Sequence, residues 1–193
     1  MLNGLMEAGR QGMAEYTVRP YALSRRKFAS FAYVADQLGY RYAGHTPGTG
    51  ATNNPYFTFR RTADAPERAA AAMAEYPGIL HGGPLPGMRQ GGGLDPLPEV
   101  RAEVGLFYSQ MVLDGCARYN RRVLPNIVLL LVAAVVILAI AGFPATGTLI
   151  AGAIWLVFFA LYLLGLTISR RRATTHAARL AEAGVQWPPR GGR

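Results

Sequence analysis

The sequence contains almost no cysteine and almost no lysine. Cys116 is the only cysteine in 193 residues, which excludes an intrachain disulfide, and Lys27 is the only lysine. A phosphate-binding Walker loop needs a lysine followed by serine or threonine after its glycines. The glycine-rich segment GHTPGTG at 44–50 contains no lysine. We therefore do not expect a phosphate loop of this type.

Histidine and serine are also scarce. The three histidines, His45, His81 and His176, lie far apart in the sequence and form no HExxH or Cys/His zinc pattern. Only four serines occur, and none lies in a GxSxG motif. The sequence therefore predicts no catalytic, cofactor-binding or metal-binding residues, no cofactor and no enzymatic activity.

Charge is sparse and unevenly distributed. Charged residues make up 16% of the chain, against about 25% in ordinary soluble domains, and the net charge is +9. No Asp, Glu, Lys, Arg or His occurs between Val123 and Ser169. This pattern excludes a conventional globular enzyme filling the whole chain, and it excludes wholesale disorder. It is typical of a membrane protein.

Two apolar segments predict a transmembrane helical hairpin. Residues 123–143 and 148–168 are each long enough, at 1.5 Å of rise per residue, to cross a hydrocarbon core of about 30 Å. Residues 144–147, PATG, are long enough only for a turn between them. Neither segment holds an acidic or basic side chain, which argues against a proton-coupled transporter.

Arginines flank the hairpin on both sides and predict its orientation. By the positive-inside rule, both termini face the cytoplasm and anionic lipid lies at that face. An excess of Arg over Lys, with abundant Ala and Gly, is typical of a GC-rich bacterial gene, so the expected location is the bacterial inner membrane, with two passes. The residues expected to anchor the hairpin are Arg121, Arg122, Arg170, Arg171 and Arg172.

Aromatic residues recur at helical spacing in the second segment. Trp155, Phe158, Phe159 and Tyr162 follow the pattern i, i+3, i+4, i+7, which places them on one face of a helix. They are candidates for packing between helices.

The first 76 residues predict a cytoplasmic helix–strand–strand–helix region. Ser24 is the expected N-cap of the first helix, Gly39 ends it, and 40–43 and 56–60 are the expected strands. Residues 77–97, rich in Gly and Pro, read as a flexible linker. A juxtamembrane helix over 98–122 and a basic helical tail over 169–193, with a helix stop at Gly184, complete the chain.

The expected fold class is therefore a mainly α membrane protein, in which a two-helix transmembrane hairpin joins a small α+β cytoplasmic N-terminal region and a basic helical tail. The leading functional hypothesis is a small inner-membrane accessory or scaffold protein. Its hairpin would anchor a cytoplasmic interaction module that binds a protein partner or further copies of the chain.

Two alternatives stay open. The helix–hairpin–helix layout of residues 98–184, with ARYNRR at 117–122, resembles the two-span effectors of bacterial conflict systems known as the SLATT type. That resemblance implies a homo-oligomeric pore or membrane effector. The other alternative is a membrane-tethered nucleic-acid binder, because basic residues such as Arg25, Arg41 and Arg60 stand near aromatic ones in the first region. Acidic residues dilute this charge, so we rank nucleic acid last among the partners.

Overall fold

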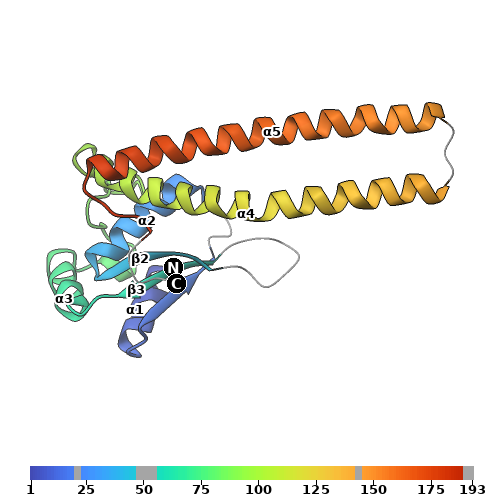
Figure 1. Cartoon of the computed structure of the whole chain (residues 1–193). Helices are drawn as coiled ribbons and strands as arrows, with labels where there is room; N and C mark the ends of the chain where they lie inside the picture. Colours follow the sequence, from blue (N-terminus) through green and yellow to red (C-terminus); the bar gives the residue numbers. More distant parts are fainter. Residues whose placement is uncertain (20–22, 47–55, 142–144, 189–193) are drawn as a thin grey trace. The chain divides into compact units, whose positions relative to one another are not determined.

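The structure is a computed structural model that describes residues 1–19, 23–46, 56–141 and 145–188, and it divides into two compact units (Figure 1). Unit 1 comprises Met1–Met111 together with Arg179–Arg193, and unit 2 comprises Val112–Ala178. The side chains of some residues in the long helices of unit 2 lie outside the description. We describe each unit by itself.

A three-stranded antiparallel sheet lies at the centre of unit 1. Its strands are β1 (Glu15–Val18), β2 (Tyr40–Thr46) and β3 (Tyr56–Arg61), and their spatial order is β1-β3-β2. Phe59 of β3 is opposite Tyr16 of β1 and Tyr42 of β2. Residues directly opposite each other on neighbouring strands point to the same face, so these three aromatic rings lie on one face of the sheet.

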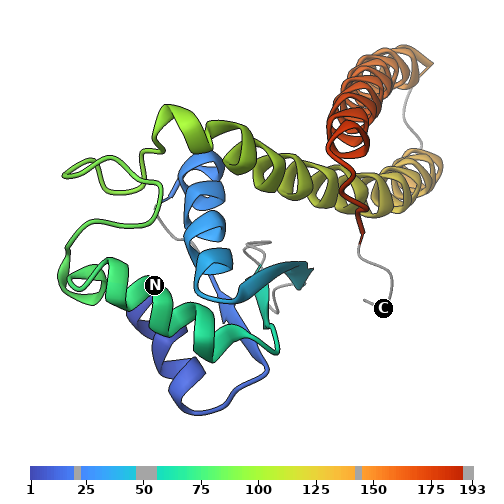
Figure 2. The same cartoon turned by 90° about the vertical axis from the view of Figure 1, so that its left-hand side faces the viewer.

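The helix α2 (Arg25–Gln37) covers this aromatic face. The Ser24 hydroxyl caps the helix by accepting a hydrogen bond from the Lys27 backbone N–H at 3.4 Å. Phe28 packs against Phe57 of β3, with ring centroids 4.3 Å apart. In Figure 2, α2 runs from the first turns of α4 to β2, the strand that follows it in the chain.

The helix α1 (Leu2–Arg10) and strand β1 are elements that the sequence did not predict. Leu5 and Ala8 of α1 are buried in the core of unit 1. Gly9 of the same helix lies so close to Tyr40 that a Cβ atom there would overlap the Tyr40 hydroxyl. Tyr40 is 2% exposed, and its hydroxyl has no hydrogen-bond partner among the residues described. Burial raises the pKa of Tyr40, and nearby Arg61 offsets only part of that effect.

Gly39 sets the close approach between the α2–β2 corner and α3 (Ala65–Glu75). Its φ of +82° lies in the left-handed region that glycine adopts without strain. A Cβ at this position would collide with the backbone of Ala65. The structure thus contains α2, β2, β3 and α3 in the predicted order, with α1 and β1 in front of them.

Part of the segment interpreted as a linker, 77–97, packs into the core. Ile79, in the short helix η1 (Ile79–His81), is 3% exposed and Met88 is 5% exposed. Met88 also forms an antiparallel bridge with Pro96. A second short helix, η2 (Pro98–Val100), leads directly into α4. These contacts give the glycine- and proline-rich segment a fixed path over unit 1.

Two long helices follow, α4 (Arg101–Ala141) and α5 (Ala145–Glu182), which run antiparallel in Figure 1. The predicted juxtamembrane helix and first apolar segment form one continuous helix, and the second apolar segment continues into the basic tail. The first turns of α4 belong to unit 1, where Val104 and Met111 join the core.

The end of α5 returns the chain to the sheet. Gly184, with φ +69°, closes a Schellman motif, in which the Val185 N–H donates to the Leu180 carbonyl and the Gly184 N–H to that of Ala181. Leu180 is 2% exposed. Beyond this turn, Trp187 stacks on Tyr42 with centroids 5.3 Å apart and rings inclined by 9°.

The transmembrane hairpin predicted over 123–143 and 148–168 is contradicted. In the part of the chain that the structure describes, no helix has the length and apolar character that a membrane crossing requires.

Several expectations were deduced from the hairpin and are corrected with it. These are the inner-membrane location and the two-pass orientation with cytoplasmic termini. The anionic-lipid partner stays a prediction. The fold class is α+β, with one three-stranded sheet and long helices, rather than a mainly α membrane protein.

Candidate functional site

Unit 2 carries an extensive uncovered apolar surface. Eight large apolar side chains of α5 keep between 44% and 70% of their surface exposed. At roughly 100 Å² each, about half of what a large apolar side chain offers, they present roughly 800 Å². The largest apolar patch on a typical soluble monomer is about 300–600 Å². The eight residues are Leu156, Val157, Phe158, Phe159, Leu161, Leu163, Leu164 and Ile168.

The helix α4 adds a second strip of the same kind. Leu129, Val132 and Val136 are 68%, 53% and 48% exposed. Their spacing of i, i+3 and i+7 places them on one side of the helix. We call these three side chains and the eight of α5 the hairpin surface.

Little of unit 2 is buried among its described side chains. Tyr162 and Ser169 of α5 are 8% and 9% exposed, and their seven-residue spacing puts them on one side of the helix. Val112 of α4 is 6% exposed. Helices that are apolar on every side are normally buried all round. In this unit the buried strip is narrow and the hairpin surface is left without a cover.

The predicted packing residues of α5 divide between these two environments. Tyr162 is buried and Trp155 is half-buried, whereas Phe158 and Phe159 are exposed and belong to the hairpin surface. The Phe159 and Tyr162 rings lie 6.4 Å apart. The sequence therefore identified four residues of one region, but only part of the set contributes to the inner side of the hairpin.

The arginines predicted to anchor the hairpin lie in α4 and α5. Arg170, Arg171 and Arg172 are exposed on α5. Arg121 and Arg122 belong to α4, and their side chains are outside the described set. Their anchoring role presupposed a membrane span, which the described helices do not provide.

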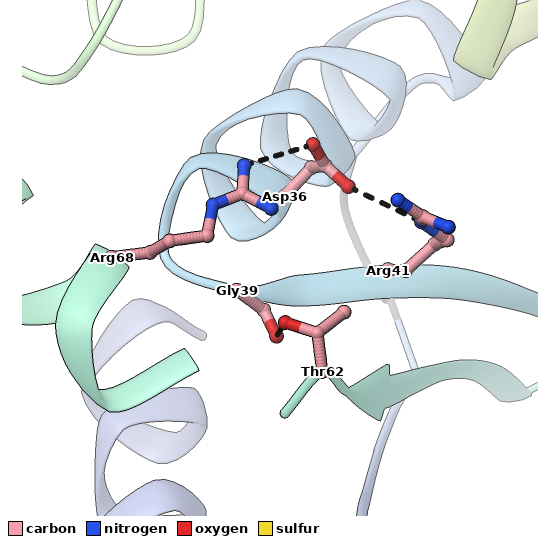
Figure 3. A network of polar contacts seen from close by, with 5 residues as sticks. All are labelled: Asp36, Gly39, Arg41, Thr62 and Arg68. Carbon is pink, nitrogen blue, oxygen red and sulfur yellow. Dashed lines mark hydrogen bonds and ion pairs between the residues drawn. The ribbon is translucent and has the colours of Figure 1, made fainter. Parts of the chain in front are cut away.

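Unit 1 contains a polar network at the corner between α2 and β2 (Figure 3). Arg68 of α3 donates to the Asp36 carboxylate at 3.3 Å, and Arg41 of β2 lies 3.9 Å from the other oxygen of Asp36. Next to them, the Thr62 hydroxyl donates to the Gly39 carbonyl at 2.9 Å. Both oxygens of the carboxylate face arginines. We therefore assign the network to holding three elements together, where such part-exposed pairs contribute about 1 kcal/mol or less each.

Three aromatic residues that the sequence places near basic ones are buried in unit 1. Tyr40, Tyr42 and Phe59 are 2% exposed or less, and their rings belong to the core. Arg41 and Arg60, which face each other across β2 and β3, alternate with these aromatics and so lie on the opposite face of the sheet. Stacking of nucleic-acid bases needs exposed rings, which these three residues do not offer.

The described residues also contain no group of three or more His, Cys, Asp or Glu that could hold a metal ion. Cys116 is a free, half-buried thiol. One open hollow of about 200 Å³ lies between α1 and η1, below the roughly 300–1,000 Å³ of most ligand pockets. Its lining residues are Asn3, Met6, Arg10, Leu80 and His81.

Comparison of the sequence with protein families, curated proteins and solved structures finds no match. The functional argument therefore depends on the geometry of the chain itself.

Sequence reasoning missed the leucines of the hairpin surface as individual contact residues. Leu156, Leu161 and Leu164 lack the helical periodicity that drew attention to the aromatics, because the whole segment is apolar. The signal that could have identified them is this absence of a polar face. The contact between Trp187 and Tyr42 had no local signal, since the two residues are far apart in the sequence.

Proposed function

We propose that this protein is a scaffold that binds another protein chain through the hairpin surface of unit 2. The observation that carries this proposal is the row of exposed apolar side chains on α5, from Leu156 to Ile168. Burying surface of this kind yields about 25 cal/mol per Å², so roughly 800 Å² represents a large gross driving force for association.

The charge pattern supports binding by apolar contact. No acidic, basic or histidine residue occurs between Val123 and Ser169. A partner that covers this region therefore leaves no buried charge on this chain without a counter-ion, a situation that would cost several kcal/mol. Unit 1, with its own core, is then the module that the scaffold brings to its partner.

In-cell photo-crosslinking tests this function. A benzophenone side chain placed at Phe158 or Leu161, both exposed on the hairpin surface, should form covalent adducts with protein. The matched control places the same group at Thr174, which is exposed on the polar end of α5. Protein adducts from Phe158 and Leu161 but not from Thr174 support the scaffold. An absence of protein adducts from both positions contradicts it.

A further inference from the structure

The partner class of the hairpin surface follows from its charge and its size. We propose that the hairpin surface binds a second copy of this chain, so that two antiparallel helix pairs form a four-helix bundle. This inference rests on the proposed function, because it names the partner of the same surface.

The first argument is charge. The segment from Val123 to Ser169 has no acidic, basic or histidine side chain, so a charged partner finds no ion-pair partner on the hairpin surface. Two identical uncharged surfaces meet without like-charge repulsion, which costs several kcal/mol where it occurs. A second copy is also the partner whose apolar surface is known to be of the same extent.

The second argument is area. A standard protein interface buries about 800 Å² on each partner. The exposed apolar side chains of α5 present roughly this much in total around the helix, and Leu129, Val132 and Val136 of α4 add to the area that a second hairpin can cover. A helical hairpin supplies two of the four helices that enclose an apolar bundle core, and a second hairpin supplies the other two.

The distribution of arginine selects the relative direction of the two copies. Arg121 and Arg122 in α4 and Arg170–Arg172 in α5 lie at the open end of each hairpin, whereas its turn carries no charge. Parallel copies would bring both arginine groups together. Antiparallel copies separate them by roughly 35 Å of helix, well beyond the screening length of about 8 Å in physiological salt.

Light scattering on the full-length chain tests the self-association. At low micromolar concentration in buffer, we expect a particle of twice the 20.8 kDa chain mass. Phe158→Asp, which places a carboxylate on the hairpin surface, should reduce the mass to that of one chain. Met13→Asp is the matched control, because it introduces the same charge at an exposed apolar residue of unit 1 and should leave the dimer intact.

Cross-linking with a bismaleimide tests the direction. The single native cysteine, Cys116, lies near the open end of the hairpin, so two antiparallel copies should not be linked through it. Moving the thiol to the middle of the apolar segment 148–168, in the Cys116→Ser, Phe158→Cys variant, should yield a linked dimer. Efficient linkage through native Cys116, with none through the cysteine at 158, would overturn the antiparallel arrangement.

Other outcomes separate this inference from the proposed function. A monomer whose Phe158 adducts contain only other proteins overturns the second-copy proposal and leaves the scaffold intact. A monomer that binds neutral phosphatidylcholine vesicles and gives no protein adducts overturns both. A dimer that persists with Phe158→Asp also overturns the proposed surface.

Discussion

The packing of α1 against β2 can be tested at a single hydroxyl group. Tyr40 is almost fully buried, its hydroxyl has no hydrogen-bond partner among the described residues, and it lies against Gly9. A methyl group at Gly9 would overlap that hydroxyl, whereas the next nearest ring atom, Cζ, lies 3.5 Å from the Cβ position. Gly9→Ala should therefore depend on whether residue 40 is tyrosine or phenylalanine.

The expected change in the free energy of unfolding for each variant is the sum of opposing contributions. In a helix, Ala is more favourable than Gly by about 1 kcal/mol, but forcing a methyl into a packed core costs about 1–3 kcal/mol. We expect Gly9→Ala alone to lower the free energy of unfolding by about 1 kcal/mol. Tyr40→Phe removes an unpaired buried hydroxyl, whose burial costs about 1–3 kcal/mol, and should raise the stability by about 1 kcal/mol.

The double variant should then be about 2 kcal/mol more stable than the native chain, because the helical preference for Ala remains and the collision is gone. Hydrogen exchange of the β2 and β3 amides measures this, since those amides report on unit 1. An equal loss from Gly9→Ala in the tyrosine and phenylalanine backgrounds would refute the steric account. A loss of stability with Tyr40→Phe alone would show that the hydroxyl has a partner.

Three further predictions concern unit 1. Trp187→Ala should remove the stack on Tyr42 and lower stability by about 2 kcal/mol, seen as roughly 30-fold faster exchange of β2 amides, while Trp187→Phe should lose about half as much. Gly39→Ala should lower stability by about 3 kcal/mol or more in urea unfolding, because it adds left-handed strain to a collision with the Ala65 backbone; a loss under about 1 kcal/mol would contradict this geometry. Because burial raises the pKa of Tyr40 above its ordinary value of 10.0, Tyr40 ionises first in the unfolded chain, so the contribution of Tyr40 to stability should be constant below pH 10 and be lost above it; Tyr40→Phe should remove this part of the alkaline fall in urea titrations at several pH values.

The local signals in the middle of unit 1 were sufficient to locate its elements. Ser24 caps α2, the apolar spacing of Phe28 and Phe31 gives its buried face, and Gly39 ends the turn that follows it. Each of these signals depends on neighbours within a few residues. The strand ranges were shorter than the real β2 and β3, because cross-strand pairing extends strands beyond their own apolar residues.

Elements fixed by distant contacts could not be predicted in the same way. The four residues of β1 are too few for a clear alternation, and they form a strand because β3 pairs with them. The helix α1 depends on burial of Leu5 against residues far along the chain. Likewise Met88 joins the core from a segment whose glycines and prolines indicate a linker.

The apolar segments show a different limit of sequence reasoning. The hydrophobic effect is non-directional. The apolar composition of 123–168 therefore indicates that burying these side chains is favourable, but it does not identify the surface that covers them. The exposed ring of Phe158 and the buried ring of Tyr162 stand four residues apart on one helix, and no periodicity in the sequence separates them. What the sequence does carry is the placement of charge, absent along the hairpin surface and concentrated in the arginines at its open end. The same distribution permits two uncharged surfaces to meet and opposes a parallel alignment of their ends. The sequence therefore bears more directly on the direction of the proposed assembly than on the identity of what covers the surface.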